Sequence, residues 1–114
     1  MSIPVLVKQL VEKKVTAFCK NRIPPHARHQ IRMTFKLRGN HVTLFEERPL
    51  YQDPSQWTKM PIAQFRYNPE TGEWMLYWKD RDEKWNEYWD FEPSKDLDDL
   101  IREVDEDPTH IFWG

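Results

Sequence analysis

Residues 74–89 decide the fold, and they read Trp-Met-Leu-Tyr-Trp-Lys-Asp-Arg-Asp-Glu-Lys-Trp-Asn-Glu-Tyr-Trp. Two aromatic runs, Trp74 to Lys79 and Lys84 to Trp89, flank a polar turn, which predicts an antiparallel hairpin. Cross-strand aromatic pairs stabilise such a hairpin by about 0.2 to 1 kcal/mol each. A turn with an even number of residues places on one face Trp74, Leu76, Trp78, Trp85, Glu87 and Trp89.

The residues before this hairpin predict another one. Apolar and polar side chains alternate from Ile31 to Arg38 and again from Val42 to Glu47, which is the period of a half-buried strand. Gly39-Asn40 lies between the two runs and tolerates the positive φ of a tight turn. The first strand carries a basic outer face, because three of its four polar positions are Arg32, Lys36 and Arg38.

A strand from Ile62 to Tyr67 completes a three-stranded meander with the aromatic hairpin. Turn residues around Asn68-Pro69 separate this strand from the hairpin. Before it we expect a loop over residues 50–61, closed by Pro61, with Trp57 folded back onto the core.

Helical patterns lie at both ends of the chain. Apolar residues recur at helical spacing from Leu6 to Phe18, which predicts an amphipathic helix over residues 3–20 with Ser2 as its cap. We expect Ser94 to cap a second helix that ends before Pro108. Its apolar stripe consists of Leu97, Leu100, Ile101 and Val104. The acidic residues at its end require a cation nearby, and the apolar tail over 111–114 is expected to pack on the sheet.

These elements predict one α+β domain over residues 1–114. Its antiparallel sheet of about five short strands has the two helices on one face. Cys19 is the sole cysteine, so no disulfide framework exists, and its place on a helical stripe predicts a buried thiol. No run approaches the ~18 apolar residues of a membrane span, and lysines interrupt the first twenty residues. We therefore expect a cytoplasmic protein without membrane association.

The charge changes sign along the chain. Nine basic residues and one acidic residue precede Glu46, whereas eight basic and eighteen acidic residues occur from Glu46 onward. Oppositely charged segments can neutralise each other within one fold, or either can face a charged partner. We expect either internal pairing of the two halves or macromolecular recognition at one of them.

The binding hypothesis places a basic stripe on phosphate groups and neighbouring tyrosines on bases. The stripe consists of Lys20, Arg22, Arg28, Arg32, Lys36 and Arg38, and the tyrosines are Tyr67, Tyr77 and Tyr88. The alternative binding surface is the acidic segment from Glu92 to Asp107, which would meet a basic protein or mimic nucleic acid. Both interpretations describe an accessory or regulatory protein whose partner is a nucleic acid or a protein.

The competing interpretation is a small metal-dependent nuclease or hydrolase. It would combine Glu47 or Asp53 with Arg48 and Arg66 around a divalent cation, with the arginines stabilising phosphate charge. Glu46 and Glu47 point to opposite faces of a strand and cannot share a metal without a bulge. The simpler role for both arginines is in structural ion pairs, with acids such as Glu47, Asp53 or Asp80.

The sequence offers few other residues for metal binding, nucleophilic catalysis or cofactor binding. His26 and His29 could chelate, but they lie in a basic loop without a second ligand pair, so we expect no metal. A buried Cys19 is a poor nucleophile. The three glycines, Gly39, Gly72 and Gly114, form no phosphate-binding loop, and we expect no cofactor.

Short motifs along nearly the whole chain together resemble a known family. They are Glu47-Arg48-Pro49, Asp53-Pro54-Ser55-Gln56-Trp57-Thr58, Pro61-Ile62-Ala63, Phe65-Arg66-Tyr67, Trp74-Met75-Leu76-Tyr77-Trp78, Asp80-Arg81, Lys84-Trp85 and Phe112-Trp113-Gly114. The combination is similar to domain-of-unknown-function family 3024, small uncharacterised bacterial proteins. The resemblance implies a bacterial or phage-borne soluble protein and brings no catalytic residue with it. Asp82-Glu83 departs from the Asn-Gly expected in the family and loosens the turn assignment.

Overall fold

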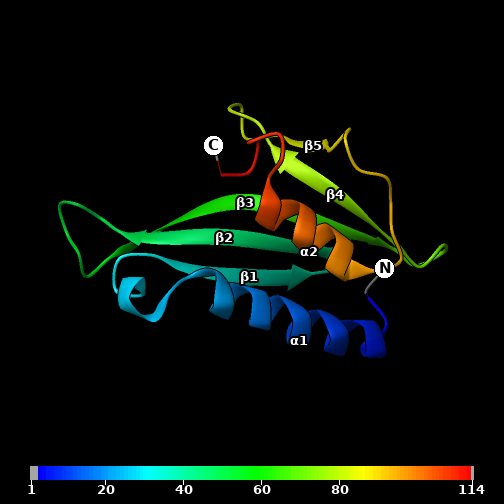
Figure 1. The fold of residues 1–114 in the computed structure, drawn as a ribbon, viewed down its shortest axis with the longest axis horizontal. Helices are drawn as coiled ribbons and strands as arrows, with labels where there is room; N and C mark the ends of the chain where they lie inside the picture. Colours follow the sequence, from blue (N-terminus) through cyan, green and yellow to red (C-terminus); the bar gives the residue numbers. More distant parts are fainter. Residues whose placement is uncertain (1–2, 114) are drawn as a thin grey trace.

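Five antiparallel strands form one sheet, and their order across the sheet is their order along the chain (Figure 1). The strands are β1 (Arg32–Arg38), β2 (His41–Pro49), β3 (Trp57–Asn68), β4 (Glu73–Lys79) and β5 (Trp85–Glu87). The computed structural model describes residues 3–113, so the predicted Ser2 cap lies outside the described residues. The hairpin and the meander are confirmed, with Gly39 at φ +58° in the first turn.

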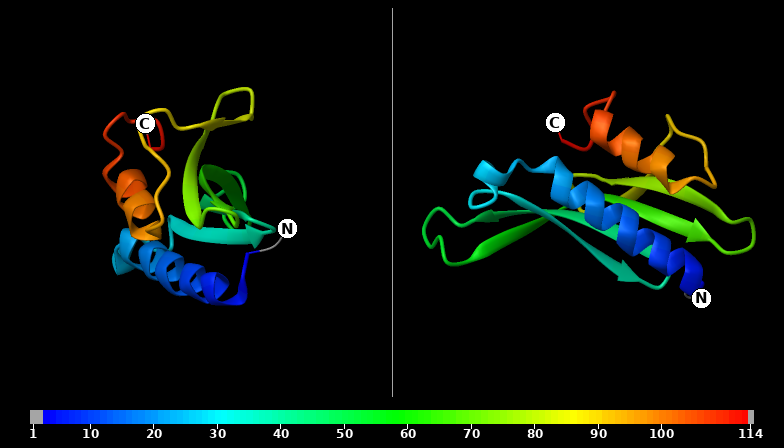
Figure 2. Two further views of the ribbon diagram at one scale, coloured as in Figure 1. Left: turned by 90° about the vertical axis from the view of Figure 1, so that its right-hand side faces the viewer. Right: turned by 60° about the horizontal axis from the view of Figure 1, so that its bottom comes forward.

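Both helices lie on the same side of this sheet (Figure 2). Helix α1 (Val5–Arg22) packs on β1, helix α2 (Leu97–Glu106) packs on β4, and the two helices contact each other. A short 3₁₀ turn, η1 (Pro25–Ala27), connects α1 to β1. The predicted α+β class, with two helices covering one face, is confirmed, and the opposite face is called the open face below.

The hydrophobic core fills the space between the helices and the sheet. Val11 and Val15 of α1, Leu100 of α2, and Leu44 and Phe65 of the sheet belong to one buried cluster. The apolar stripe of α1 is narrower than the sequence pattern predicted, because Leu6 is 78% exposed and Leu10 is also exposed. Cys19 is buried as predicted, and burial raises the pKa of its thiol to about 11.

Strand β3 begins at Trp57, so the predicted loop over residues 50–61 was too long. Leu44 pairs with Ala63 whereas Phe45 pairs with Pro61, which leaves Ile62 as the extra residue of a β-bulge. A bulge tolerates proline within a strand, which explains why Pro61 does not end the element. Trp57 does not fold onto the core, since its ring lies 4.0 Å from the guanidinium carbon of Arg32.

The β4–β5 loop has an odd number of residues, whereas we predicted an even number, so the β5 side chains lie on the opposite faces from those predicted. Lys79 pairs with Trp85 and Tyr77 pairs with Glu87, so the loop from Asp80 to Lys84 has an odd number of residues. Glu83 adopts φ +62°, and the Asp80 carboxylate accepts hydrogen bonds from the amides of Asp82 and Lys84. Trp85 and Glu87 therefore share a face with Tyr77 and Lys79. The predicted grouping with Trp74, Leu76 and Trp78 was wrong.

The apolar tail packs against α2 and the Tyr88 ring, whereas we expected it to pack on the sheet, and the cap of α2 also differs from the predicted one. The side chain of Asp96 accepts a hydrogen bond from the amide of Asp98 at 3.0 Å and caps α2. The Ser94 hydroxyl, two residues earlier, accepts from the amide of Asp96 and is not the cap. Phe112 is buried, and Trp113 donates its indole N–H to the carbonyl of Val104. Gly114 lies outside the described residues.

Candidate functional site

The open face of the sheet carries a basic hollow of about 760 Å³. Its lining combines three cationic side chains with two aromatic rings and contains no carboxylate. The lining residues are Lys36, Arg38, Gly39, Asn40, His41, Thr43, Phe45, Gln64, Arg66 and Trp85. This volume lies within the range of ligand sites in proteins.

Strand register brings these residues together. Arg38 pairs with His41, which in turn pairs with Arg66. Two residues along, Lys36 pairs with Thr43, and Thr43 pairs with Gln64. Side chains two residues apart on a strand point to the same face, so two neighbouring rows of polar groups lie side by side.

Arg66 is held in place by its neighbours. Its guanidinium carbon lies 3.8 Å from the ring centroid of Tyr77, and its Nε donates to Oε1 of Gln64 at 2.6 Å. Gln64 in turn donates from Nε2 to the Thr43 hydroxyl at 2.9 Å. The Arg66 terminal N–H groups make no ion pair with a carboxylate of residues 3–113. A stacked guanidinium with free donors is suited to bind an anion.

His41 responds to this positive environment. Burial lowers the pKa of His41 first, and the charge of Arg66 lowers it further. The imidazole is therefore neutral at about pH 7. An anion bound beside it would raise its pKa, because negative charge favours imidazolium.

Lys36 and Arg38 carry unpaired charges beside Arg66. No carboxylate among the described residues lies within 4.0 Å of any of these three cations. At the far edge of the open face, Glu87 faces Tyr77 and does not line the hollow. The hollow therefore concentrates positive charge on a molecule whose net charge is −2.

The opposite end of the open face is neutralised. Glu47 is 8% exposed and accepts hydrogen bonds from Thr34 at 2.6 Å and from Arg32 at 3.1 Å, with Lys59 at 4.0 Å. The pKa of Glu47 is lowered, most strongly by the hydrogen bond from Thr34 and then by the hydrogen bond and positive charge of Arg32. Arg32 is thus engaged by Glu47 and by the Trp57 ring.

The structure disperses the predicted basic stripe. Lys36 and Arg38 lie in the hollow, whereas Lys20, Arg22 and Arg28 lie at the end of α1 and just after η1. Arg22 pairs with Asp105 at 3.0 Å and stacks on Trp113, which supplies the cation that the acidic end of α2 required. Arg28 donates to the carbonyl oxygen of Lys20.

The three predicted tyrosines also separate. Tyr77 lies on the open face under Arg66. Tyr67 packs against Trp74 in the core layer, with ring centroids 4.9 Å apart. Tyr88 is 1% exposed, and its hydroxyl contacts Glu103 and Thr109. Only Tyr77 of the three is placed to contact a ligand on the open face.

The residues of the nuclease interpretation do not converge. Glu47 and Arg48 point to opposite faces of β2, and the partner of Arg48 is Glu46 at 2.6 Å rather than an acid predicted for it. Asp53 accepts from Ser55 within its own loop. Arg66 pairs with His41, at the other end of β2 from Glu47. Within residues 3–113, no group of three or more His, Cys, Asp or Glu side chains could hold a metal ion.

Sequence reasoning did not find His41, Phe45 or Trp85 as members of the site. The register across Gly39-Asn40 contained the signal for His41, because a two-residue turn places it opposite Arg38. Phe45 lies at the bulge, and Trp85 depends on the odd length of the β4–β5 loop. Neither irregularity has an unambiguous sequence signature.

Comparison with known proteins identifies one family. The model of a domain of unknown function, DUF3024, matches residues 3–114, which is nearly the whole chain. No curated protein and no solved structure matches the chain. No helix in the described part of the chain has the length and apolarity that a membrane crossing requires.

Proposed function

The chain belongs to the DUF3024 family, and we propose that it is a binding protein that holds single-stranded nucleic acid on the open face of its sheet. In this proposal Lys36, Arg38 and Arg66 contact phosphates, while the rings of Trp85 and Phe45 stack on bases. The role is accessory or regulatory, in the cytoplasm of a bacterium or a phage-infected cell.

The observation that carries the proposal is the basic hollow itself. Three unpaired cations and two rings line one concave surface without a carboxylate among them. Single-stranded nucleic acid needs this combination, because its phosphates attract cations and its bases present flat apolar faces. The neutral His41 adds a hydrogen-bonding group that can donate or accept.

The acidic alternative has less support. Asp98 and Asp105 of the acidic segment bind Lys14 and Arg22 of α1, and Asp107 accepts hydrogen bonds from two tail amides. These carboxylates are used inside the molecule and are less available to a partner. The nuclease interpretation lacks support from geometry, since its four residues lie apart.

Salt dependence of binding is the first test. We expect a fluorescein-labelled oligothymidylate to bind with a log–log salt slope near −2, because three phosphate contacts to a single strand contribute about 0.7 each. Affinity should then fall about 20-fold between roughly 50 and 200 mM salt. Fluorescence anisotropy measures both quantities.

A charge-reversal pair locates the surface. Lys36→Glu with Arg38→Glu should weaken binding at least about tenfold and flatten the salt slope by about 1.4. The matched control is Lys13→Glu with Lys95→Glu, which changes the net charge equally at exposed positions outside the hollow. Equal losses in both variants would reduce the effect to net charge and would refute the proposed surface.

A further inference from the structure

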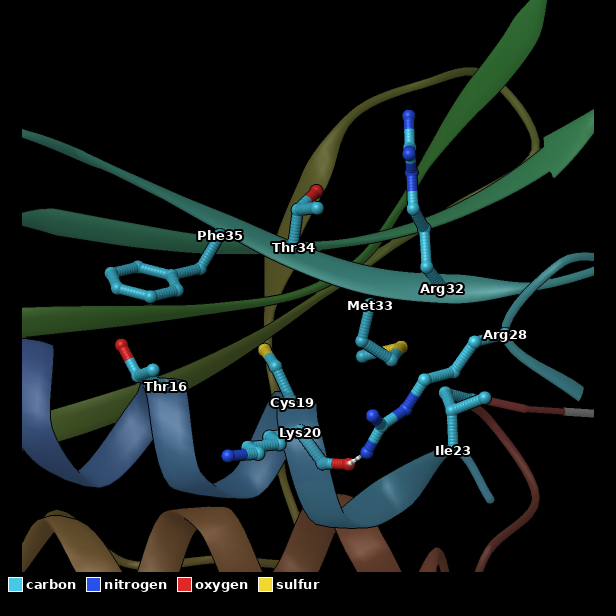
Figure 3. Close-up of a pocket in the computed structure, with 9 residues that line it drawn as sticks. All are labelled: Thr16, Cys19, Lys20, Ile23, Arg28, Arg32, Met33, Thr34 and Phe35. Atoms are coloured by element: carbon cyan, nitrogen blue, oxygen red, sulfur yellow. Dashed lines mark hydrogen bonds between the residues drawn. The ribbon is translucent and has the colours of Figure 1, made fainter. Parts of the chain in front are cut away.

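A second hollow of about 470 Å³ lies between the C-terminal half of α1 and strand β1 (Figure 3). Cys19 and Ile23 of the helical side and Met33 and Phe35 of β1 line it. In Figure 3 the side chains of Met33 and Phe35 point from the strand toward α1, and Cys19 points back toward the strand. This helix groove therefore has an apolar floor of aliphatic, aromatic and sulfur-containing groups.

Two cations stand at the rim of the helix groove. Lys20 and Arg28 are exposed, and neither has a carboxylate of the described residues within 4.0 Å. Arg28 donates from Nη2 to the carbonyl oxygen of Lys20 at 3.3 Å, which holds its guanidinium beside the Lys20 backbone (Figure 3). Arg32 also borders the groove, but its side chain points away toward Glu47.

We propose that the helix groove binds an amphipathic carboxylate of the fatty-acid class. The acyl chain lies against Cys19, Met33 and Phe35, and the carboxylate contacts Lys20 and Arg28 at the rim. Charge complementarity selects an anionic head group, because the rim presents two unpaired cations and no acid. The apolar floor selects a hydrocarbon tail over a nucleotide, since it offers few polar partners for a base or a sugar.

The proposal is independent of nucleic-acid binding, because Lys20 and Arg28 lie outside the basic hollow. Burial of the tail supplies the affinity. Each added methylene should tighten binding about fourfold, from the ~0.8 kcal/mol of a buried CH₂, until the groove is filled. Binding is non-covalent, because a free carboxylate carries no activated acyl group that a thiol could attack.

Calorimetry with octanoate, decanoate and dodecanoate, below their micelle-forming concentrations, tests the ligand class. We expect affinity to rise with chain length, and we expect decanoate to bind better than decanol and decyltrimethylammonium by about tenfold. Equal affinity for decanoate and decyltrimethylammonium would refute an anion-selective groove. Failure of all three carboxylates to bind would refute the site.

Variants locate the binding. Lys20→Glu with Arg28→Glu should weaken decanoate about tenfold and leave decanol unchanged. The control Lys13→Glu with Lys95→Glu should leave both unchanged. Thr16→Trp, which adds a bulky ring at the edge of the groove, should weaken every tail-bearing ligand without altering charge. An unchanged decanoate affinity in the first variant would contradict the proposal, and circular dichroism verifies that each variant is folded.

Cys19 provides a readout that does not depend on a substitution. It is the sole cysteine of the chain and lines the groove, so alkylation of the protein reports on this position alone. Its reaction with a maleimide is slow because the thiol is buried and its pKa is raised, and saturating decanoate should slow that reaction further, several-fold. An unchanged alkylation rate with decanoate bound would place the ligand elsewhere.

Discussion

The helix layer, formed by α1 and α2, and the open face of the sheet differ in how their charged side chains are paired. Between α1 and α2, basic and acidic side chains meet as ion pairs, Lys14 with Asp98 and Arg22 with Asp105. On the open face, Lys36, Arg38 and Arg66 surround a hollow without a carboxylate. The two faces contain the same types of cation, and the difference lies in the presence of a partner.

This difference separates two roles for the charge polarity of the chain. Pairing in the helix layer serves the fold, because the acidic end of α2 receives the cation that its dipole requires. Unpaired cations on the open face repel one another and cost stability. Surface charge that does not stabilise the fold favours recognition as its role, which is why we propose binding at the open face.

The largest expected effect on stability concerns Asp107, which joins the end of α2 to the C-terminal segment. Asp107 is buried at φ +45°, and its carboxylate accepts from the amides of Phe112 and Trp113 at 3.1 and 2.9 Å. Asp107→Ala should lower the free energy of unfolding by about 3 kcal/mol, because the buried amide of Phe112 and the partly buried amide of Trp113 lose a charged acceptor. Urea denaturation measures the loss. Asp107→Asn keeps one acceptor and should lose about half as much, whereas equal losses would contradict this role.

The next prediction concerns Glu47, the paired exception on the open face. Glu47→Gln should cost about 2 kcal/mol, because Thr34 and Arg32 lose a charged acceptor. Because the pKa of Glu47 is lowered from 4.5 in the folded protein, the unfolded chain binds more protons at acidic pH. The stabilising contribution of the Glu47 carboxylate therefore falls as pH drops below about 4.5. Urea titrations at about pH 3 and pH 6 should show a larger wild-type advantage at the higher pH. A constant difference would exclude this carboxylate as the cause.

A smaller effect is expected at Arg66. Arg66→Gln should weaken oligothymidylate about fivefold and reduce the salt slope by about 0.7, since one phosphate contact is lost. The same variant should raise the His41 pKa, because the charge of Arg66 lowers it in the wild type. Histidine proton shifts followed by NMR measure that change. A His41 pKa that stays constant would show that burial alone sets it.

The smallest expected effect concerns the ion pair between Lys14 of α1 and Asp98 of α2. A double-mutant cycle of Lys14→Ala and Asp98→Ala should give a coupling energy of about 0.5 kcal/mol, because both side chains are partly exposed to water. Neither substitution should change oligothymidylate affinity beyond its effect on net charge. A large loss of binding in either variant would extend the site to the helix layer.

Much of the fold was predictable because it rests on local alternation. The structure confirms the strand predicted from the alternation in Ile31–Arg38 and the helix predicted from the apolar stripe of α2. It also confirms the turn predicted at Gly39. The errors lie where a single residue changes the period. Ile62 bulges beside Pro61, and Glu83 makes the β4–β5 loop odd in length, which reverses the faces of β5.

The candidate site was predictable only in part for the same reason. Lys36, Arg38 and Tyr77 were predicted as members of a binding surface, whereas Arg66 was predicted to stabilise phosphate charge only within the nuclease interpretation. The sequence did not reveal that Tyr88 lies outside the site, because its burial depends on packing against α2. There its hydroxyl donates a hydrogen bond to the Glu103 carboxylate. His41 joins the site through the register of the regular Gly39-Asn40 turn, which the sequence contained. Trp85 joins it through the odd length of the β4–β5 loop, which the sequence leaves ambiguous.

Mapping by NMR with unlabelled oligothymidylate tests the central claim most directly, because it observes both faces in the unmodified protein. The account predicts that amide shifts concentrate in residues 36–43 and 64–66 and at the Trp85 indole, while residues of α1 and α2 stay unchanged. Shifts that concentrate on α1 or α2, or that spread evenly over every exposed cation, would contradict an open face specialised for recognition.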